Sequence, residues 1–281
     1  LTAKKDFTYI ETNNPEDNST NIDQAIRNGF TTIISLSYLQ AEELENAAKD
    51  NPKLKFALVD GEITGKKNIS SATFKDQESA YLAGLAAAYT TKSDQVGFIG
   101  GMEGPVIQRF QSGFEAGVKA GATALNKEIT VNVQYAASYD SLDKGKAIAA
   151  SMYKEGVDIL YQAAGSTGAG VFQEAKARNE NDYSRKAWVI GVDRDQADEG
   201  DYKMENGETG NFTLTSTKKN VGAEVKEFAE TSHNDKFPGG KHLTFGLKEE
   251  GVDLTKGQLS EEAYQAVSDA KEKIISGDFR L

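Results

Sequence analysis

Two aspartates follow short apolar runs, at places where a carboxylate could meet a ligand. Asp60 comes after residues 54–59, and Asp193 comes after residues 187–192. A carboxylate can accept hydrogen bonds from two neighbouring hydroxyl groups, and each charge-assisted bond contributes roughly 1.5 to 3 kcal/mol. Asp193 therefore suits a sugar-like diol. Asp60 could accept from a base or a sugar, although capping a turn is an equally good use of it.

Two aromatic side chains lie close to other expected turns. Tyr38 follows the apolar run of residues 31–36, and Phe172 follows a glycine-rich turn. The Tyr38 ring could lie against a flat ligand ring, whereas many loop tyrosines are simply half-buried. Packing into the core is the first expectation for Phe172. The residues alone leave both choices open.

Two glycine-rich segments each join an apolar run to a helical pattern. Residues 100–104 follow the run 96–99, and residues 165–170 follow the run 157–161. Neither has the glycine spacing of the dinucleotide fingerprint, and the first lacks the Gly-Lys-Ser/Thr ending of a phosphate loop. Backbone N–H groups of the second turn could face a ligand oxygen. The glycines of the first could equally serve only to make room for a tight turn.

The composition argues against metal sites and against most side-chain catalysis. The chain has no cysteine and only two histidines, His233 and His242, which lie in a polar segment. Thiol chemistry, a histidine metal site and a Ser-His-Asp triad are therefore not expected, and both histidines are expected to be ordinary surface residues. Residues 193–195 lack the glycine and glutamate of a calcium loop. We expect no cofactor and no enzyme, although hydrolysis by carboxylates alone stays an alternative.

The length and charge limit the class of protein. With 281 residues, of which 38% are hydrophobic, the chain can bury a sizeable core, and two lobes are expected. The formal net charge of -11 argues against a nucleic-acid partner, because phosphate neutralisation needs a basic face. No apolar run approaches the roughly 20 residues of a membrane span. Leu1 does not open a signal peptide, so the residues leave export undecided.

The elements that would position these residues alternate between strand and helix. This alternation predicts a doubly wound, mostly parallel sheet with right-handed crossovers. Residues 5–10 are expected to be extended, residues 179–185 to form a polar loop, and residues 196–210 to form an exposed hairpin or loop. The expected strands are residues 31–36, 54–59, 69–74, 96–99, 129–135, 157–161 and 187–192. The expected helices are residues 21–28, 41–49, 77–90, 105–118, 143–154, 169–178, 221–229 and 261–275.

The segment around the first glycine turn resembles the signature of a known family. Gly100-Gly101-Met102-Glu103-Gly104, followed by Arg109-Phe110 and Gly113-Phe114-Glu115-Ala116-Gly117, is similar to the basic membrane protein family of solute-binding lipoproteins. The similarity continues through nearly the whole chain. It implies an α/β, two-lobe, periplasmic-binding-protein-like (type I) fold in which each lobe is a doubly wound, mostly parallel sheet. The implied lobes are residues 1–94 plus 218–244 and residues 95–217 plus 245–281.

The resemblance also implies a function. Well-understood members of the family bind purine nucleosides for an ABC importer. The implied role is a monomeric, extracytoplasmic carrier that delivers a nucleoside to a permease and an ATPase and changes nothing covalently. Its membrane link would be a lipid on a cysteine ahead of the mature domain, a cysteine that this sequence does not contain. Sugars and autoinducer-like ligands stay open, as do a nucleoside-processing enzyme and a ligand-sensing regulatory domain on the same fold.

By their positions in the family's motifs, several residues look like ligand contacts. In the family, aromatic rings hold the base, an aspartate holds the ribose hydroxyls, and a lysine approaches the sugar. The implied ligand-binding residues are Tyr38, Asp60, Met102, Tyr161, Gly165, Phe172, Asp193 and Lys219. Family members usually open with a buried strand and an Asp-Asp-x-Ser-Phe-Asn segment that adds an aromatic and a polar contact. This sequence starts just past that point, so the first strand–helix unit of the first lobe is expected to be missing from it.

Overall fold

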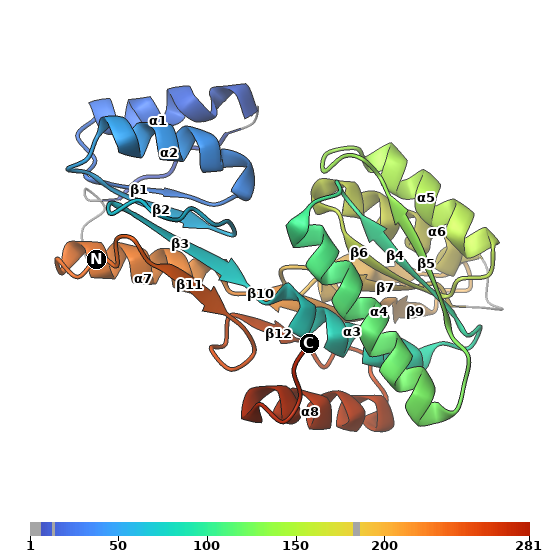
Figure 1. Cartoon of the computed structure of the whole chain (residues 1–281). Coiled ribbons are helices and arrows are strands. Elements are labelled where there is room, and N and C mark those ends of the chain that lie inside the picture. The colour runs from blue at the N-terminus through green and yellow to red at the C-terminus, as the bar shows by residue number, and fades with distance from the viewer. Residues whose placement is uncertain (1–6, 13–14, 182–185) are drawn as a thin grey trace. The chain divides into compact units, whose positions relative to one another are not determined.

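The computed structural model describes residues 7–12, 15–181 and 186–281, and it divides into two compact units (Figure 1). The first unit is Leu1–Phe74 with Asn220–Phe245, and the second is Lys75–Lys219 with Gly246–Leu281. Each unit has a parallel-dominated sheet between helices. This confirms the expected α/β fold class.

The first unit has a four-stranded parallel sheet in the order β1 (Thr32–Ser35), β2 (Lys55–Val59), β3 (Ile69–Phe74) and β11 (His242–Phe245). Helices α1 (Asn18–Arg27) and α2 (Ala41–Asp50) cover one face, and α7 (Val221–His233) covers the other (Figure 1). The apolar runs supply the core. Leu44 of α2 and Phe56 of β2 are fully buried in the same cluster of apolar side chains. The carboxyl ends of β1 and β2 carry the loops with Tyr38 and Asp60.

The expected extended run over residues 5–10 forms no strand where the structure describes it, from residue 7 onward. Lys5 and Asp6 lie outside the described residues. Phe7 and Tyr9 are 55% and 77% exposed, because no element of the described chain pairs with this segment. Within the described residues β1 pairs only with β2, so β1 is an edge strand.

The second unit has a six-stranded sheet that is parallel except for one edge strand. The strand order is β12 (Val252–Leu254), β10 (Thr213–Lys219), β7 (Trp188–Gly191), β6 (Ile159–Ala163), β4 (Gln95–Gly100) and β5 (Thr130–Tyr135). Alternate residues of β4 face opposite layers. Phe98 contacts Phe114 of α4 (Pro105–Leu125), whereas Ile99 packs with residues of α5 (Leu142–Lys154) and α6 (Gly168–Asn181). Strands β11 and β12 were not expected from the sequence because each is only three or four residues long.

Two segments of the second unit were expected to form loops or a hairpin. The expected hairpin or loop at residues 196–210 is the antiparallel pair β8 (Asp201–Lys203) and β9 (Thr209–Asn211), which confirms it. The expected polar loop at residues 179–185 begins inside α6, which runs to Asn181. Residues 182–185 of that loop lie outside the described residues.

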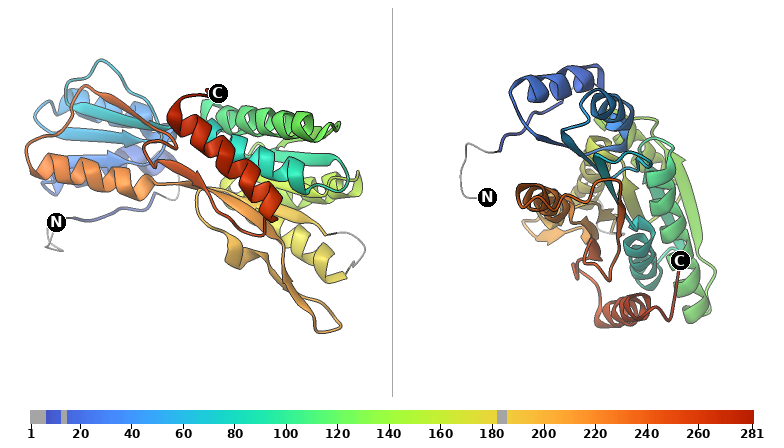
Figure 2. Two further views of the ribbon diagram at one scale, coloured as in Figure 1. Left: turned by 90° about the horizontal axis from the view of Figure 1, so that it is seen from below. Right: turned by 60° about the vertical axis from the view of Figure 1, so that its left-hand side comes forward.

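Helix α3 (Asp76–Thr90) belongs to the second unit because it packs tightly on α4. A Cβ atom on Gly84 would lie 2.2 Å from the Phe114 carbonyl oxygen, and one on Gly117 would lie 2.0 Å from the Tyr81 carbonyl oxygen. Helix α8 (Glu261–Ser276) lies along α3 as well (Figure 2). The chain therefore passes between the units at residues 74/75, earlier than the expected boundary at 94, and again at 219/220 and 245/246.

Candidate functional site

The second unit brings four of the eight candidate residues, Met102, Gly165, Asp193 and Lys219, to the carboxyl edge of its sheet. The loops after β4, β5, β6 and β7 meet there, because parallel strands end at the same edge. Gly101 N–H donates to the Ala163 carbonyl at 3.0 Å, which joins the two glycine turns directly. Met102, in the first of these turns, is 44% exposed. Gly165, in the second, has a φ of +57°, a conformation that glycine adopts without strain.

Asp193 stands on a turn whose backbone is fixed from several sides. Its φ is +65°, and its carbonyl oxygen accepts from the Lys219 N–H at 2.9 Å. Gln196 also fixes this turn, because its Oε1 accepts hydrogen bonds from Val192 N–H at 2.8 Å and from Gln162 Nε2 at 2.9 Å. The Asp193 residue itself is exposed. A rigid turn therefore presents this carboxylate at the edge of the sheet.

Lys219 ends β10 and carries a nearly buried ammonium group. Its side chain is 6% exposed, and Nζ lies 2.9 Å from Oδ1 of Asp76 and 5.1 Å from the centre of the Phe110 ring. Asp76 is fully buried, and its Oδ2 accepts from Arg109 Nε at 3.1 Å and from an Arg109 terminal nitrogen at 2.9 Å. The cluster thus holds one carboxylate between two cations. The structure brings Lys219 and Asp193 together through neighbouring strands β10 and β7.

Tyr161 and Phe172 lie inside the second unit rather than on its edge. The Tyr161 ring is fully buried among Phe98, Phe110 and Phe114, and its hydroxyl lies 3.0 Å from Oγ1 of Thr217. Burial raises the pKa of Tyr161 well above its ordinary value of 10, and the bond to Thr217 opposes this only in part. Phe172 is 4% exposed and packs on Phe212. A role for either ring in ligand binding stays a prediction, and both rings are almost entirely buried.

Tyr139, which the sequence did not predict as a ligand contact, lies against both glycine turns. A Cβ atom on Gly101 would lie 2.3 Å from the Tyr139 ring, and one on Gly165 would lie 3.2 Å from the Tyr139 carbonyl oxygen. Thr167 N–H also donates to that carbonyl at 3.1 Å. Tyr139 follows β5 just as Tyr38 follows β1, and this placement of an aromatic residue after a strand was the signal that could have found it.

The first unit brings Tyr38 and Asp60 together. Asp60 has a φ of +63°, and its N–H donates to the Ala72 carbonyl of β3 at 2.8 Å. A Cβ atom on Gly61 would lie 3.0 Å from Cα of Tyr38, so the two loops touch. Both Tyr38 and Asp60 are partly exposed. This unit therefore offers an aromatic ring and a carboxylate at the carboxyl edge of its own sheet.

His242 is not the ordinary surface residue that the sequence predicted. It is half-buried in the first unit, where Nδ1 lies 2.9 Å from the Ser71 hydroxyl and Nε2 lies 2.9 Å from the Thr73 hydroxyl. Since strands β11 and β3 are neighbours, the ring serves to pair them. Among the described residues, no group of three or more His, Cys, Asp or Glu side chains is arranged to hold a metal ion.

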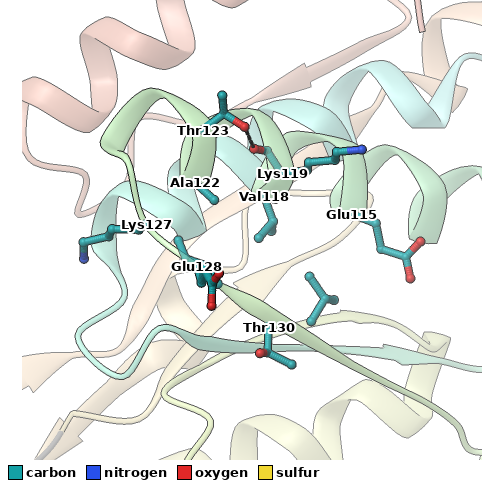
Figure 3. Close-up of a pocket in the computed structure, with 10 residues that line it drawn as sticks. Glu115, Val118, Lys119, Ala122, Thr123, Lys127, Glu128 and Thr130 are labelled. Carbon is teal, nitrogen blue, oxygen red and sulfur yellow. Dashed lines mark hydrogen bonds between the residues drawn. The ribbon is translucent and has the colours of Figure 1, made fainter.

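Two hollows on the surface lie away from these residues. Figure 3 shows one of about 420 Å³ between α4 and the edge strand β5, lined by residues that include Glu115, Lys119 and Thr130. None of the candidate ligand contacts lines it. In the part of the chain that the structure covers, no helix combines the length and apolar character needed to cross a membrane.

These two sheets, with charged and aromatic residues at their carboxyl edges, place the chain with the periplasmic-binding-protein type I fold. A solved structure of an ABC transporter solute-binding protein from Aeropyrum pernix K1 superimposes with a TM-score of 0.82 at 26% identity, covering 96% of this chain and 82% of that one. A transcriptional activator of the comK gene from Bacillus halodurans shares the fold at 24% identity, with a TM-score of 0.75, covering 95% of this chain and 86% of that one.

Sequence comparison defines the family. The family described as "ABC transporter substrate-binding protein PnrA-like" matches residues 3–280. An "ABC transporter nucleoside-binding protein BmpA" from Lactococcus lactis subsp. cremoris is 46% identical over 96% of this chain and 76% of its own length. "Basic membrane protein A" from Borreliella burgdorferi is 33% identical over 88% of this chain and 70% of its own length. The chain belongs to this family of ABC transporter substrate-binding proteins, which confirms the resemblance; it is a family of binding proteins and not of enzymes.

Proposed function

We propose that this protein captures a purine nucleoside and delivers it to the permease and ATPase of an ABC importer. The observation that carries the proposal is the fixed turn of Asp193 beside Lys219, at the carboxyl edge of the second sheet. The name of the Lactococcus relative, a nucleoside-binding protein, supports the choice of ligand class. Nucleosides offer both a vicinal diol and a flat base, which match the residue types at this edge.

The proposed contacts divide the nucleoside between its two parts. Asp193 accepts hydrogen bonds from the ribose hydroxyls, and Lys219 donates to an oxygen of the sugar. Tyr139 and Met102 offer apolar surface to the base from the second unit, and Tyr38 and Asp60 offer a ring and an acceptor from the first. Gly165 lets the second turn approach the ligand with its backbone. Binding then favours one state of the protein, which the membrane components recognise, and no bond is made or broken.

We propose further that the protein works as a monomer outside the cytoplasm, attached to the cell membrane by a lipid that precedes this sequence. The support is its family, in which proteins named basic membrane proteins occur, and its net charge of -11, which suits solubility rather than nucleic-acid binding. Light scattering of the purified chain, which would report a dimer directly, checks the monomer.

The test of the ligand is a calorimetric titration with adenosine, guanosine, inosine, uridine and ribose. We expect purine nucleosides to bind and ribose alone not to bind, because the base supplies the stacking energy. Incubating each nucleoside with the protein for hours, followed by chromatography, separates a carrier from an enzyme. Binding of ribose alone or appearance of a free base would overturn the proposal.

A further inference from the structure

The first turn of α3 carries two buried acidic residues that contact different partners. Asp76 is fully buried and Glu78 is 8% exposed. The turn begins directly after the first passage of the chain between the units. All of the partners described below belong to the second unit.

Asp76 contacts the residue that precedes the second passage. Its Oδ1 lies 2.9 Å from Nζ of Lys219, the last residue of β10. Its Oδ2 is held by two nitrogens of Arg109, at 2.9 and 3.1 Å. Because Arg109 fixes the carboxylate, the carboxylate in turn fixes the direction of the Lys219 ammonium group.

Glu78 contacts the residues that follow the third passage. Its Oε2 accepts from the Leu247 N–H at 2.8 Å, and its Oε1 lies 3.3 Å from Nζ of Lys75. A Cβ atom on Gly246 would lie 2.4 Å from Oε2, so the chain passes directly over the carboxylate. Glu78 therefore binds a backbone N–H group, whereas Asp76 binds the side chain of Lys219, which the proposed function uses.

We propose that Asp76 is a positioning residue for ligand binding: it holds the Lys219 ammonium group where it meets the nucleoside. The inference rests on the proposed function, in which Lys219 touches the ligand. A long lysine side chain has many rotamers, and ordering one during binding costs affinity. A buried ion pair orders the rotamer before the ligand arrives, so this loss of entropy does not oppose binding. The ring of Phe110, 5.1 Å from Nζ, restricts the ammonium group from another side.

The test is a double-mutant cycle on nucleoside affinity, measured by calorimetry. Asp76→Asn should weaken binding about tenfold or more in the unaltered chain and should have no further effect in a Lys219→Met background. Equal losses in both backgrounds would mean that Asp76 acts on the fold and not through Lys219, and would overturn the proposal. So would full affinity of Asp76→Asn.

Glu78→Gln is the matched control, because it removes a charge of the same sign from the same turn without touching Lys219. It should lower the melting temperature and leave affinity within about twofold. If Asp76→Asn does not fold, the comparison of Asp76→Asn/Lys219→Met with Lys219→Met decides instead, because the double variant buries no unpaired ammonium. A lower affinity of the double variant would contradict the proposal.

An independent readout separates this inference from the proposed function. In protein labelled with ¹⁵N-lysine, a hydrogen-bonded ammonium group gives a resolved NMR signal, which Lys219→Met identifies by its absence. The signal should be present in the unliganded protein and lost in Asp76→Asn. Absence of nucleoside binding would overturn the proposed function alone, whereas survival of the signal in Asp76→Asn would overturn the inference alone.

Discussion

The two units bury a carboxylate in the first turn of a helix in opposite ways. In the second unit, Asp76 of α3 is held by Arg109 and Lys219. In the first unit, Glu224 of α7 is 5% exposed, and among the described residues its Oε2 has no hydrogen-bond partner. Burial, and then the neighbouring Glu227, raises the pKa of Glu224 to about 7. A buried carboxyl group is thus paired with two cations in one place and pushed toward its neutral form by burial in the other.

The strand-end aspartates show a similar division. Asp60 and Asp193 have nearly the same left-handed backbone, with φ of +63° and +65°. Asp60 is partly buried next to the loop of Tyr38, whereas Asp193 is exposed beside Lys219. The second unit therefore combines an exposed carboxylate with a positioned cation, and we expect it to supply more of the binding energy.

The largest expected effect tests the packing of the second unit. Gly117→Val places a side chain where a Cβ would lie 2.0 Å from the Tyr81 carbonyl, so α3 and α4 must separate. We expect the free energy of unfolding to fall by about 3 kcal/mol or more, which lowers the melting temperature by roughly 10 °C. The single tryptophan, Trp188, lies in β7 of the second unit, so its fluorescence reports this unit.

Gly222→Ala in α7 is the control for that experiment, because nothing lies within 4 Å of the added Cβ. It should leave the Trp188 transition in place. A Gly117→Val protein with an unchanged transition would show that the close contact of α3 and α4 relaxes at little cost.

The next effect concerns Asp193. Asp193→Asn removes the charge from its hydrogen bonds to the proposed diol, and we expect nucleoside affinity to fall about 100-fold, or about 2.7 kcal/mol. Isothermal titration with adenosine measures it. Titration of the 2′,3′-dideoxy analogue is the control, because the two proteins should bind that ligand equally well.

The pH dependence of stability sharpens the contrast between Glu224 and Asp76. With a pKa of about 7 in the folded state and 4.5 as its ordinary value, Glu224 holds a proton that the unfolded chain releases between these values. Its contribution to stability is therefore fully present below about pH 4.5 and is lost as the pH rises to about 7. Glu224→Gln should remove this loss and raise the free energy of unfolding at pH 8 by about 2 kcal/mol.

Urea unfolding at pH 5 and pH 8, followed by circular dichroism, measures the effect of Glu224→Gln. Glu227→Gln is the control, since Glu227 is only the smaller cause of the raised pKa. Equal stability differences at both pH values would contradict the prediction.

The smallest expected effect concerns Asp60. Asp60→Asn should weaken nucleoside binding about tenfold, or about 1.4 kcal/mol, less than the matching change at Asp193. Calorimetry of the two variants side by side checks the order. If Asp60→Asn proves the more damaging, the first unit and not the second dominates recognition.

The sequence predicted the alternation of strand and helix well because buried β-branched runs and glycine turns are local signals. Most expected elements occur within a few residues of their predicted bounds. The unit to which α3 belongs was not predictable, since a helix buried on nearly all sides has no apolar stripe to show which neighbour it packs against. Asp76 was missed for a related reason: an acidic residue at a helix start usually needs no explanation beyond the helix dipole.

The order of elements along the chain has a consequence for biosynthesis. The first sheet needs β11, and the second unit needs β12 and α8, all of which come from residue 242 onward. Neither unit is complete until residues beyond 242 have left the ribosome, because the first unit needs the chain as far as Phe245 and the second as far as Ser276. Until these elements have left the ribosome, the nascent chain stays unfinished and is therefore accessible to chaperones and to a translocation channel.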